Sequence, residues 1–64
     1  MKARRVLAAL RKIGWVEDRQ RGSNRTLTRA GWAPYVWAFH DGDELGPVML
    51  AKIGRKTGLT PADL

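Results

Sequence analysis

Apolar residues recur at every third or fourth position near the start of the chain, and basic residues lie between them. The apolar positions are Ala3, Val6, Leu7, Leu10 and Ile13, and the basic positions are Lys2, Arg4, Arg5, Arg11 and Lys12. This spacing predicts an amphipathic helix of about three turns. Gly14 follows the last apolar position, and glycine readily takes the left-handed conformation that ends helices. We therefore expect the helix to stop before Trp15.

The next segment has the pattern of a β-hairpin with one polar face. We expect residues 15–21 to form a strand, although its last five residues are all polar. Because they cannot all point into a core, one face of this strand must meet solvent or a ligand. The glycine-serine-asparagine tripeptide at 22–24 has turn chemistry. Residues 25–29 then form a second strand, with Leu27 on the face opposite its two threonine neighbours.

The remainder of the chain predicts a third strand and a second helix. Residues 35–40 are dense in aromatic and branched residues and follow a Gly- and Pro-containing turn at 30–34. After an acidic loop at 41–44, Pro47 suits the first turn of a helix, where its missing N–H costs little. Gly58 is the expected stop of that helix.

The order helix-strand-strand-strand-helix predicts an α+β fold with a three-stranded antiparallel sheet and both helices on one face. The opposite face is then open for a partner. A chain of 64 residues has room for one domain with a small core. We expect Trp15, Trp37 and Phe39 to fill that core; the alternative is a platform on which bases stack. Trp32, in the second turn, is either a hydrophobic lid or an exposed contact for a partner.

The charge of the chain is positive and unevenly distributed. The net charge is +6, and residues 1–29 alone carry nine basic and two acidic residues. A basic region of this density attracts polyanions, of which nucleic acid is the usual one. Two alternatives are a solvated basic surface without a specific partner and an acidic protein partner.

Several kinds of site and location are excluded or disfavoured. The chain has no cysteine, so it has no disulfide, no thiolate metal site and no cysteine nucleophile. A single histidine, His40, among scattered carboxylates makes a poor zinc site, and we expect no metal and no cofactor. No apolar run approaches the roughly 20 residues of a membrane span. We therefore expect a cytoplasmic protein without a signal peptide or a transmembrane helix.

The residues around 22–24 form the candidate site. Arg19, Arg21 and Arg25 flank the tripeptide, and a guanidinium group can contact phosphate through two hydrogen bonds. Strand alternation places Arg19 and Arg21 on one face. Gly22 permits close approach of the backbone, so its N–H groups and Ser23 could hold a phosphate oxygen. The plainer alternatives are an ordinary hairpin turn and a solvated strand face.

Together these motifs resemble HicA, the YcfA-like toxin of bacterial toxin–antitoxin pairs. The shared residues are Gly14-Trp15 after a basic helix, Arg19, Gly22-Ser23, Phe39-His40, Glu44-Leu45, Pro47 and Gly58-Leu59. The resemblance runs from about Lys2 to Leu59 and implies one toxin domain over residues 1–64 with a double-stranded-RNA-binding-domain-like fold. It implies a metal-independent endoribonuclease that cleaves mRNA to arrest translation and growth. A HicB-like antitoxin would cover the active site.

The chain departs from this family at its most specific residue. The family's catalytic histidine matches position 24, where this chain has asparagine, which cannot carry a proton near neutral pH. The resemblance therefore implies an impaired enzyme. It assigns the catalytic positions to Asn24 and Ser23 and the RNA contacts to Arg19, Arg21, Gly22 and Arg25. Three explanations of Asn24 are open. It is a deliberate substitution, it belongs to a natural homologue that has lost cleavage or only binds, or its amide supports catalysis by polarising a water.

Two other functions compete with the ribonuclease. One is a non-catalytic module for structured RNA, which recognises helical shape and phosphates. The other is a protein-interaction module whose basic surface serves an acidic antitoxin. His40 resembles a catalytic base, but we expect it to form local hydrogen bonds near Asp41 or Asp43. We expect a monomer when the chain is free and a higher-order complex with the antitoxin.

Overall fold

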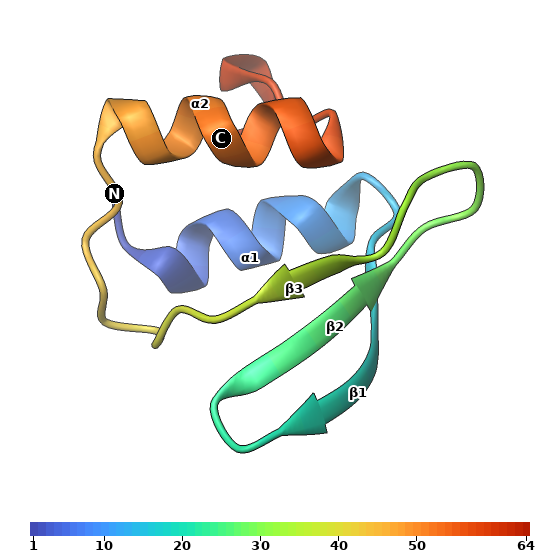
Figure 1. Ribbon diagram of the computed structural model, residues 1–64. Coiled ribbons are helices and arrows are strands. Elements are labelled where there is room, and N and C mark those ends of the chain that lie inside the picture. Colours follow the sequence, from blue (N-terminus) through green and yellow to red (C-terminus); the bar gives the residue numbers. More distant parts are fainter.

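The computed structural model describes residues 1–64 and contains two α-helices, three strands and a short 3-10 helix. In chain order these are α1 (Ala3–Lys12), β1 (Val16–Arg21), β2 (Asn24–Thr28), β3 (Tyr35–Trp37), α2 (Pro47–Thr57) and η1 (Pro61–Asp63). The strands form an antiparallel sheet in the order β1-β2-β3, and both helices lie on one side of it (Figure 1). The predicted α+β class and element order are confirmed.

The amphipathic pattern of the first segment produces the face of α1 that lies in the core. Its buried residues are Ala3, Val6, Leu7, Ala9 and Leu10. Arg11 and Lys12 occupy its last turn, where positive charge complements the helix dipole. Gly14 follows with a φ of 109°, so the chain reverses at the predicted glycine. None of the helices is long and apolar enough to cross a membrane.

The core joins this helix to the sheet and to the end of α2. Trp15 and Trp37 are its largest fully buried side chains. The indole N–H of Trp15 donates to the carbonyl oxygen of Thr57 at 3.0 Å, and the Thr57 hydroxyl donates to the carbonyl of Ile53 at 2.7 Å. Every buried side-chain polar atom has a hydrogen-bond partner. The Trp15 indole therefore joins the residue before β1 to the end of α2, and its hydrogen bond offsets the desolvation of the buried N–H.

The third strand is shorter than predicted, because it ends at Trp37 and not at His40. The backbone after Trp37 supplies carbonyl oxygens to the start of α1, because the first N–H groups of a helix have no partner within the helix. The N–H of Ala3 donates to the carbonyl of Asp43 at 2.8 Å, and the N–H of Arg4 donates to that of Asp41 at 3.2 Å. The chain therefore leaves the sheet after β3 to reach the start of α1.

The other strand boundaries move by one residue. β1 begins at Val16, so buried Trp15 precedes it. β2 covers Asn24–Thr28 where we predicted residues 25–29. Asn24 is therefore a strand residue that pairs with Arg21, and only two residues remain in the turn.

Trp32 covers the junction between β1 and α2. Its ring meets that of Trp15 edge-on with 6.1 Å between centroids, and the Arg29 guanidinium carbon lies 5.7 Å from the Trp32 ring centroid. Gly58 ends α2 with a φ of 78°, and a Cβ there would lie 2.7 Å from Trp32. The ring thus lies against a position that only glycine suits. Because Trp32 remains 42% exposed, it is a lid whose outer side is free for contact.

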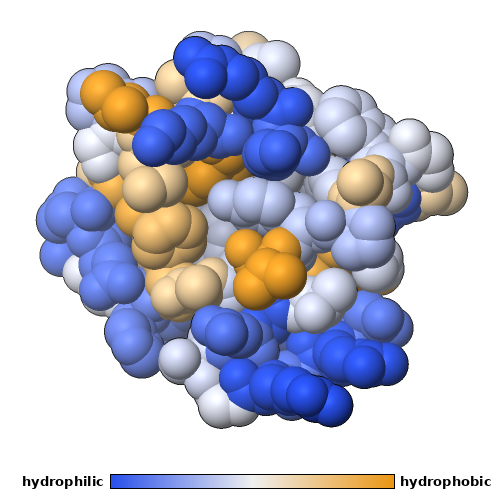
Figure 2. Space-filling model, viewed as in Figure 1, coloured by the Kyte–Doolittle hydropathy of each residue, from blue (hydrophilic) through white to orange (hydrophobic).

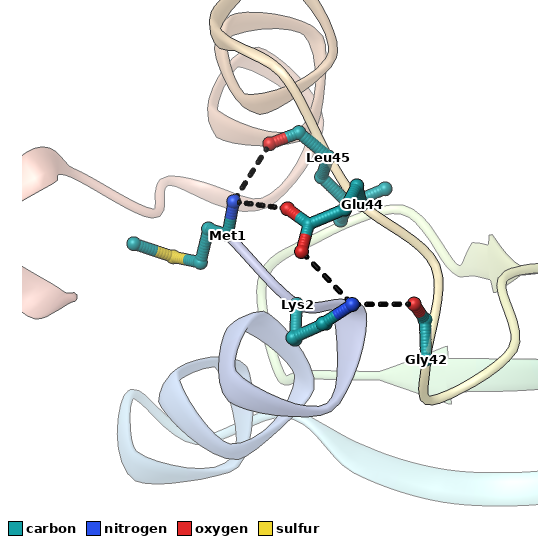
Figure 3. A network of polar contacts seen from close by, with 5 residues as sticks. All are labelled: Met1, Lys2, Gly42, Glu44 and Leu45. Atoms are coloured by element: carbon teal, nitrogen blue, oxygen red, sulfur yellow. Dashed lines mark hydrogen bonds and ion pairs between the residues drawn. The ribbon is translucent and has the colours of Figure 1, made fainter.

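A polar network ties the start of the chain to the acidic loop (Figure 3). The ammonium group of Met1 donates to Glu44 at 2.9 Å and to the carbonyl of Leu45 at 3.4 Å. Lys2 lies 3.0 Å from the other oxygen of Glu44 and donates to the carbonyl of Gly42 at 3.3 Å. Hydrogen bonds from the Met1 ammonium and from Lys2, with the charges of both, lower the pKa of Glu44 from 4.5 to about 2.

We expect the Glu44→Gln variant to be less stable than the parent protein at pH 7. Because folding lowers the pKa of Glu44, its ionised form stabilises the folded state above pH 4.5, and this contribution disappears as the pH falls toward 2. Urea unfolding at several pH values should show a difference that shrinks below pH 4.5. Asp18→Asn, an exposed carboxylate without an ion pair, is the control. A pH-independent difference would contradict this assignment.

Candidate nucleic-acid interface

The predicted site lies at the exposed end of the β1–β2 hairpin. Gly22 and Ser23 form the two-residue turn, and Gly22 has a φ of 57°. Glycine at the first central position is typical of tight hairpin turns. A Cβ at Gly22 would have no atom within 4 Å. The backbone of the turn is therefore open to a ligand from outside.

A β-bulge at Asp18 decides which face of the sheet carries the arginines. Glu17 pairs with Leu27, but Arg19 pairs with Thr26, so one extra residue is inserted in β1. Without it, strand alternation would place Arg19 on the side of Glu17. The bulge moves Arg19, and with it Arg21, to the face that no helix covers. The prediction that these two arginines share a face agrees with this register.

That uncovered face, which we call the open face, combines charge with two exposed apolar residues. The cross-strand register assigns to it Val16, Arg19, Arg21, Asn24, Thr26, Thr28 and Val36. Val16 is 59% exposed and Val36 is 56% exposed. Neither Arg19 nor Arg21 forms an ion pair, so their guanidinium groups are available to an anion. Figure 2 shows strongly hydrophilic residues gathered over β1 and the hairpin end.

Arg25 lies on the other face of the hairpin, toward the helices. It pairs with Gln20 on β1 and with buried Trp37 on β3. Its guanidinium nitrogen lies 3.5 Å from the carboxylate of Glu17, which also forms an ion pair with Arg11. The three arginines that flank the turn in sequence are thus divided between two faces, because neighbouring strand residues point in opposite directions.

A polar hollow of about 440 Å³ opens beside Arg25. Its lining consists of Gln20, Gly22, Ser23, Arg25, Phe39, His40 and Asp41. The structure therefore brings three predicted site residues, Gly22, Ser23 and Arg25, together with the chain's only histidine. The backbone N–H of His40 donates to the Asp43 carboxylate at 2.9 Å, so the expected local hydrogen bond uses the backbone.

Asn24 lies apart from this hollow. It pairs with Arg21 across the hairpin and is exposed on the open face. Position 24 therefore lies on the open face of the hairpin, and His40 lines the hollow on the other face. No cluster of three or more histidine or carboxylate side chains is arranged to hold a metal ion.

Sequence reasoning did not place Gln20, Phe39 and Asp41 in the candidate site. The sequence could have indicated Phe39 and Asp41. An antiparallel pairing of β2 and β3 brings the residues after Trp37 beside those before Arg25. The observed register joins Arg25 to Trp37. The side on which Gln20 points depends on the bulge, which no local pattern predicted.

Comparison with known proteins gives one family. The family described as the HicA toxin of bacterial toxin-antitoxin matches residues 3–59, which include both helices and all three strands. No curated protein and no solved structure matches the chain.

Proposed function

The chain belongs to the HicA toxin family of bacterial toxin–antitoxin systems, and on this premise we propose that it binds mRNA at the end of its β1–β2 hairpin as an endoribonuclease. The family makes it the toxin component of a pair with an antitoxin partner. The observation that carries the RNA-binding part is the placement of Arg19 and Arg21. Both arginines are free of ion pairs and lie on the open face next to the exposed Gly22–Ser23 turn.

The proposed reaction is a transesterification within the RNA. The 2′ oxygen bonds to phosphorus, the bond from phosphorus to the 5′ oxygen breaks, and the proton of the 2′ hydroxyl must reach the leaving oxygen. A histidine at position 24 would carry that proton, and guanidinium groups would stabilise the charge on the phosphate. Arg21 lies directly across the hairpin from position 24, where cross-strand Cβ atoms are about 4.5–5.5 Å apart.

Asparagine at position 24 removes the proton carrier and leaves the charge-stabilising groups in place. Loss of a general acid–base group typically lowers the rate by about 10²–10⁴-fold. We therefore propose that this chain binds RNA and cleaves it slowly at most. Ser23 and the N–H groups around Gly22 would hold a phosphate oxygen, and no metal or cofactor takes part.

The second candidate function is a non-catalytic module for structured RNA. It is favoured by the residues that the register assigns to the open face, which include two arginines but no histidine to transfer protons near neutral pH. Such a face would contact phosphates without cleaving them. Restoration of histidine at position 24 separates the two functions.

We propose a HicB-like antitoxin that covers the same open face. Val16 and Val36 are more than half exposed on this face. A protein partner would bury these apolar side chains, whereas phosphate groups make no favourable contact with them. Covering Arg19 and Arg21 would at the same time block RNA. We further propose that residues 1–64 act as one domain in the cytoplasm, monomeric when free and in a higher-order complex with the antitoxin.

We expect RNA binding to weaken steeply with salt and to depend on the open face. Each phosphate contact to single-stranded RNA contributes about −0.7 to the slope of log K against log salt. The double variant Arg19→Gln, Arg21→Gln should therefore bind a labelled RNA more weakly at every salt concentration, with a slope reduced by about 1.4. Fluorescence anisotropy at several salt concentrations measures both effects.

Lys56→Gln, an exposed basic residue of α2 without an ion pair, is the matched control for this variant. It should leave the slope nearly unchanged. If the parent protein shows no salt-sensitive RNA binding, the basic surface serves the antitoxin alone and the RNA proposal is wrong.

A further inference from the structure

The hollow on the helix side of the hairpin has a lining with two kinds of chemistry. Arg25 supplies a cation, and His40 and Ser23 supply further polar groups. Asp41 supplies a carboxylate, and Phe39 is the one hydrophobic residue of the lining. The lining thus combines a cation, further polar groups and a hydrogen-bond-accepting carboxylate.

The size of the hollow and the presence of Asp41 argue against a bare phosphate as its ligand. A volume of about 440 Å³ falls in the range of small-molecule sites and greatly exceeds one phosphate group. A second negative charge close to Asp41 would also be repelled. The fitting ligand combines an anionic group with hydrogen-bond donors and a flat ring.

From this we infer that the hollow binds one nucleotide of the RNA, with its phosphate on Arg25 and His40 and its base toward Asp41 and Phe39. This nucleotide subsite rests on the proposed RNA-binding function and extends it to base preference. A carboxylate accepts hydrogen bonds from the amino groups of bases, and single-stranded RNA exposes those base edges. Asp41 is thereby the residue that distinguishes one base from another.

Arg25 at the phosphate end keeps free donors for a ligand, and Phe39 at the base end is held in place by the core. The side chain of Arg25 is 26% exposed, and its contact with Glu17 is long at 3.5 Å. A guanidinium has five N–H donors, so several remain for a phosphate. Phe39 is held edge-on against Trp37, with 5.0 Å between ring centroids, which fixes its ring beside the hollow. Rigid aromatic rings of this kind are common platforms for bases.

The subsite also defines a path for the RNA around the hairpin. The Gly22–Ser23 turn lines the hollow and also joins the two strands whose other face carries Arg19 and Arg21. In this proposal an RNA strand in contact with both surfaces crosses the end of the hairpin at the turn. This crossing brings a phosphate next to position 24.

The single histidine makes the subsite directly observable by proton NMR. The imidazole signals of the protein come from His40 alone. We would titrate the parent protein with inorganic phosphate, with each of the four 5′-mononucleotides and with a short single-stranded RNA. We expect saturable shifts with nucleotides and RNA, unequal affinities among the four bases, and at least about tenfold weaker binding of inorganic phosphate, since it lacks the base contacts.

Two variants assign the two ends of the subsite. Arg25→Gln should weaken all four nucleotides and the RNA by about tenfold or more, because a charge-assisted phosphate contact is lost. Asp41→Asn should change the order of preference among the bases and leave phosphate binding intact. Asp63→Asn, a carboxylate of η1 outside both the hollow and the hairpin, is the matched control and should do neither. Circular dichroism is the check that each variant is folded.

Three outcomes would overturn the nucleotide subsite. If RNA binds through Arg19 and Arg21 while the His40 signals do not move, the hollow is not a subsite and the proposed function stands. If inorganic phosphate binds as tightly as the nucleotides and Asp41→Asn leaves the order of base preference unchanged, the hollow is an anion site only. Binding of mononucleotides but not of RNA would reject both the subsite of an RNA substrate and the proposed function itself.

Discussion

Replacing Asn24 with histidine is expected to raise the rate of RNA cleavage by about 10²–10⁴-fold, the usual contribution of a general acid–base group. The exchange changes one exposed residue at the start of β2, so the hairpin should keep its register. Arg21 lies opposite position 24 and Arg19 lies on the same face, so the new imidazole would join two cations that are already in place.

Expression of the Asn24→His variant under tight control should arrest growth and degrade total mRNA, while the parent chain does neither. Asn24→Gln is the matched control, because it changes the side chain but cannot transfer a proton. A triple variant that also carries Arg19→Gln and Arg21→Gln should lose most of the gained activity. A folded Asn24→His protein that binds RNA but never cleaves it would favour the non-catalytic RNA-binding module.

Replacing Trp37 with alanine is expected to lower the free energy of unfolding by about 3–5 kcal/mol. Trp37 is 1% exposed and lies on β3 opposite Arg25 of β2. Its ring packs against Phe39. A domain of this size has a total stability of roughly 3–10 kcal/mol, so the variant should lose about half of it and unfold at a much lower urea concentration.

Val36→Ala provides a neighbouring control on the opposite face of the same strand. Val36 is 56% exposed on the open face, so its truncation removes little buried area and costs at most about 1 kcal/mol through lower strand propensity. Urea unfolding followed by circular dichroism compares the two variants. Equal losses would mean that the open face is packed in solution, against the register described here.

The amphipathic first segment determined α1, its buried face and its end near Gly14, because the period of a helix is recorded in every third and fourth residue. The Gly22–Ser23 turn, Pro47 and Gly58 likewise marked positions that the backbone conformation itself demands. These features depend on residues close together in sequence. The family resemblance was visible for the same reason, since its motifs are local.

Tertiary contacts decided the features that depend on residues far apart in the chain. The end of β3 follows from the unpaired N–H groups at the start of α1, which recruit the carbonyls of Asp41 and Asp43. A strand of branched and aromatic residues contains no sign of that competing demand. Its length could therefore not be predicted from its composition.

The arrangement of the candidate site depended on the same long-range geometry. The sequence alone determined which residues surround the turn, but the bulge at Asp18 and the cross-strand register decided which of them face one another. They turned Arg19 and Arg21 to the open face and joined Arg25 to His40 in the hollow. The physical reason is that strand neighbours point to opposite sides, so a single inserted residue exchanges the faces without altering any local pattern.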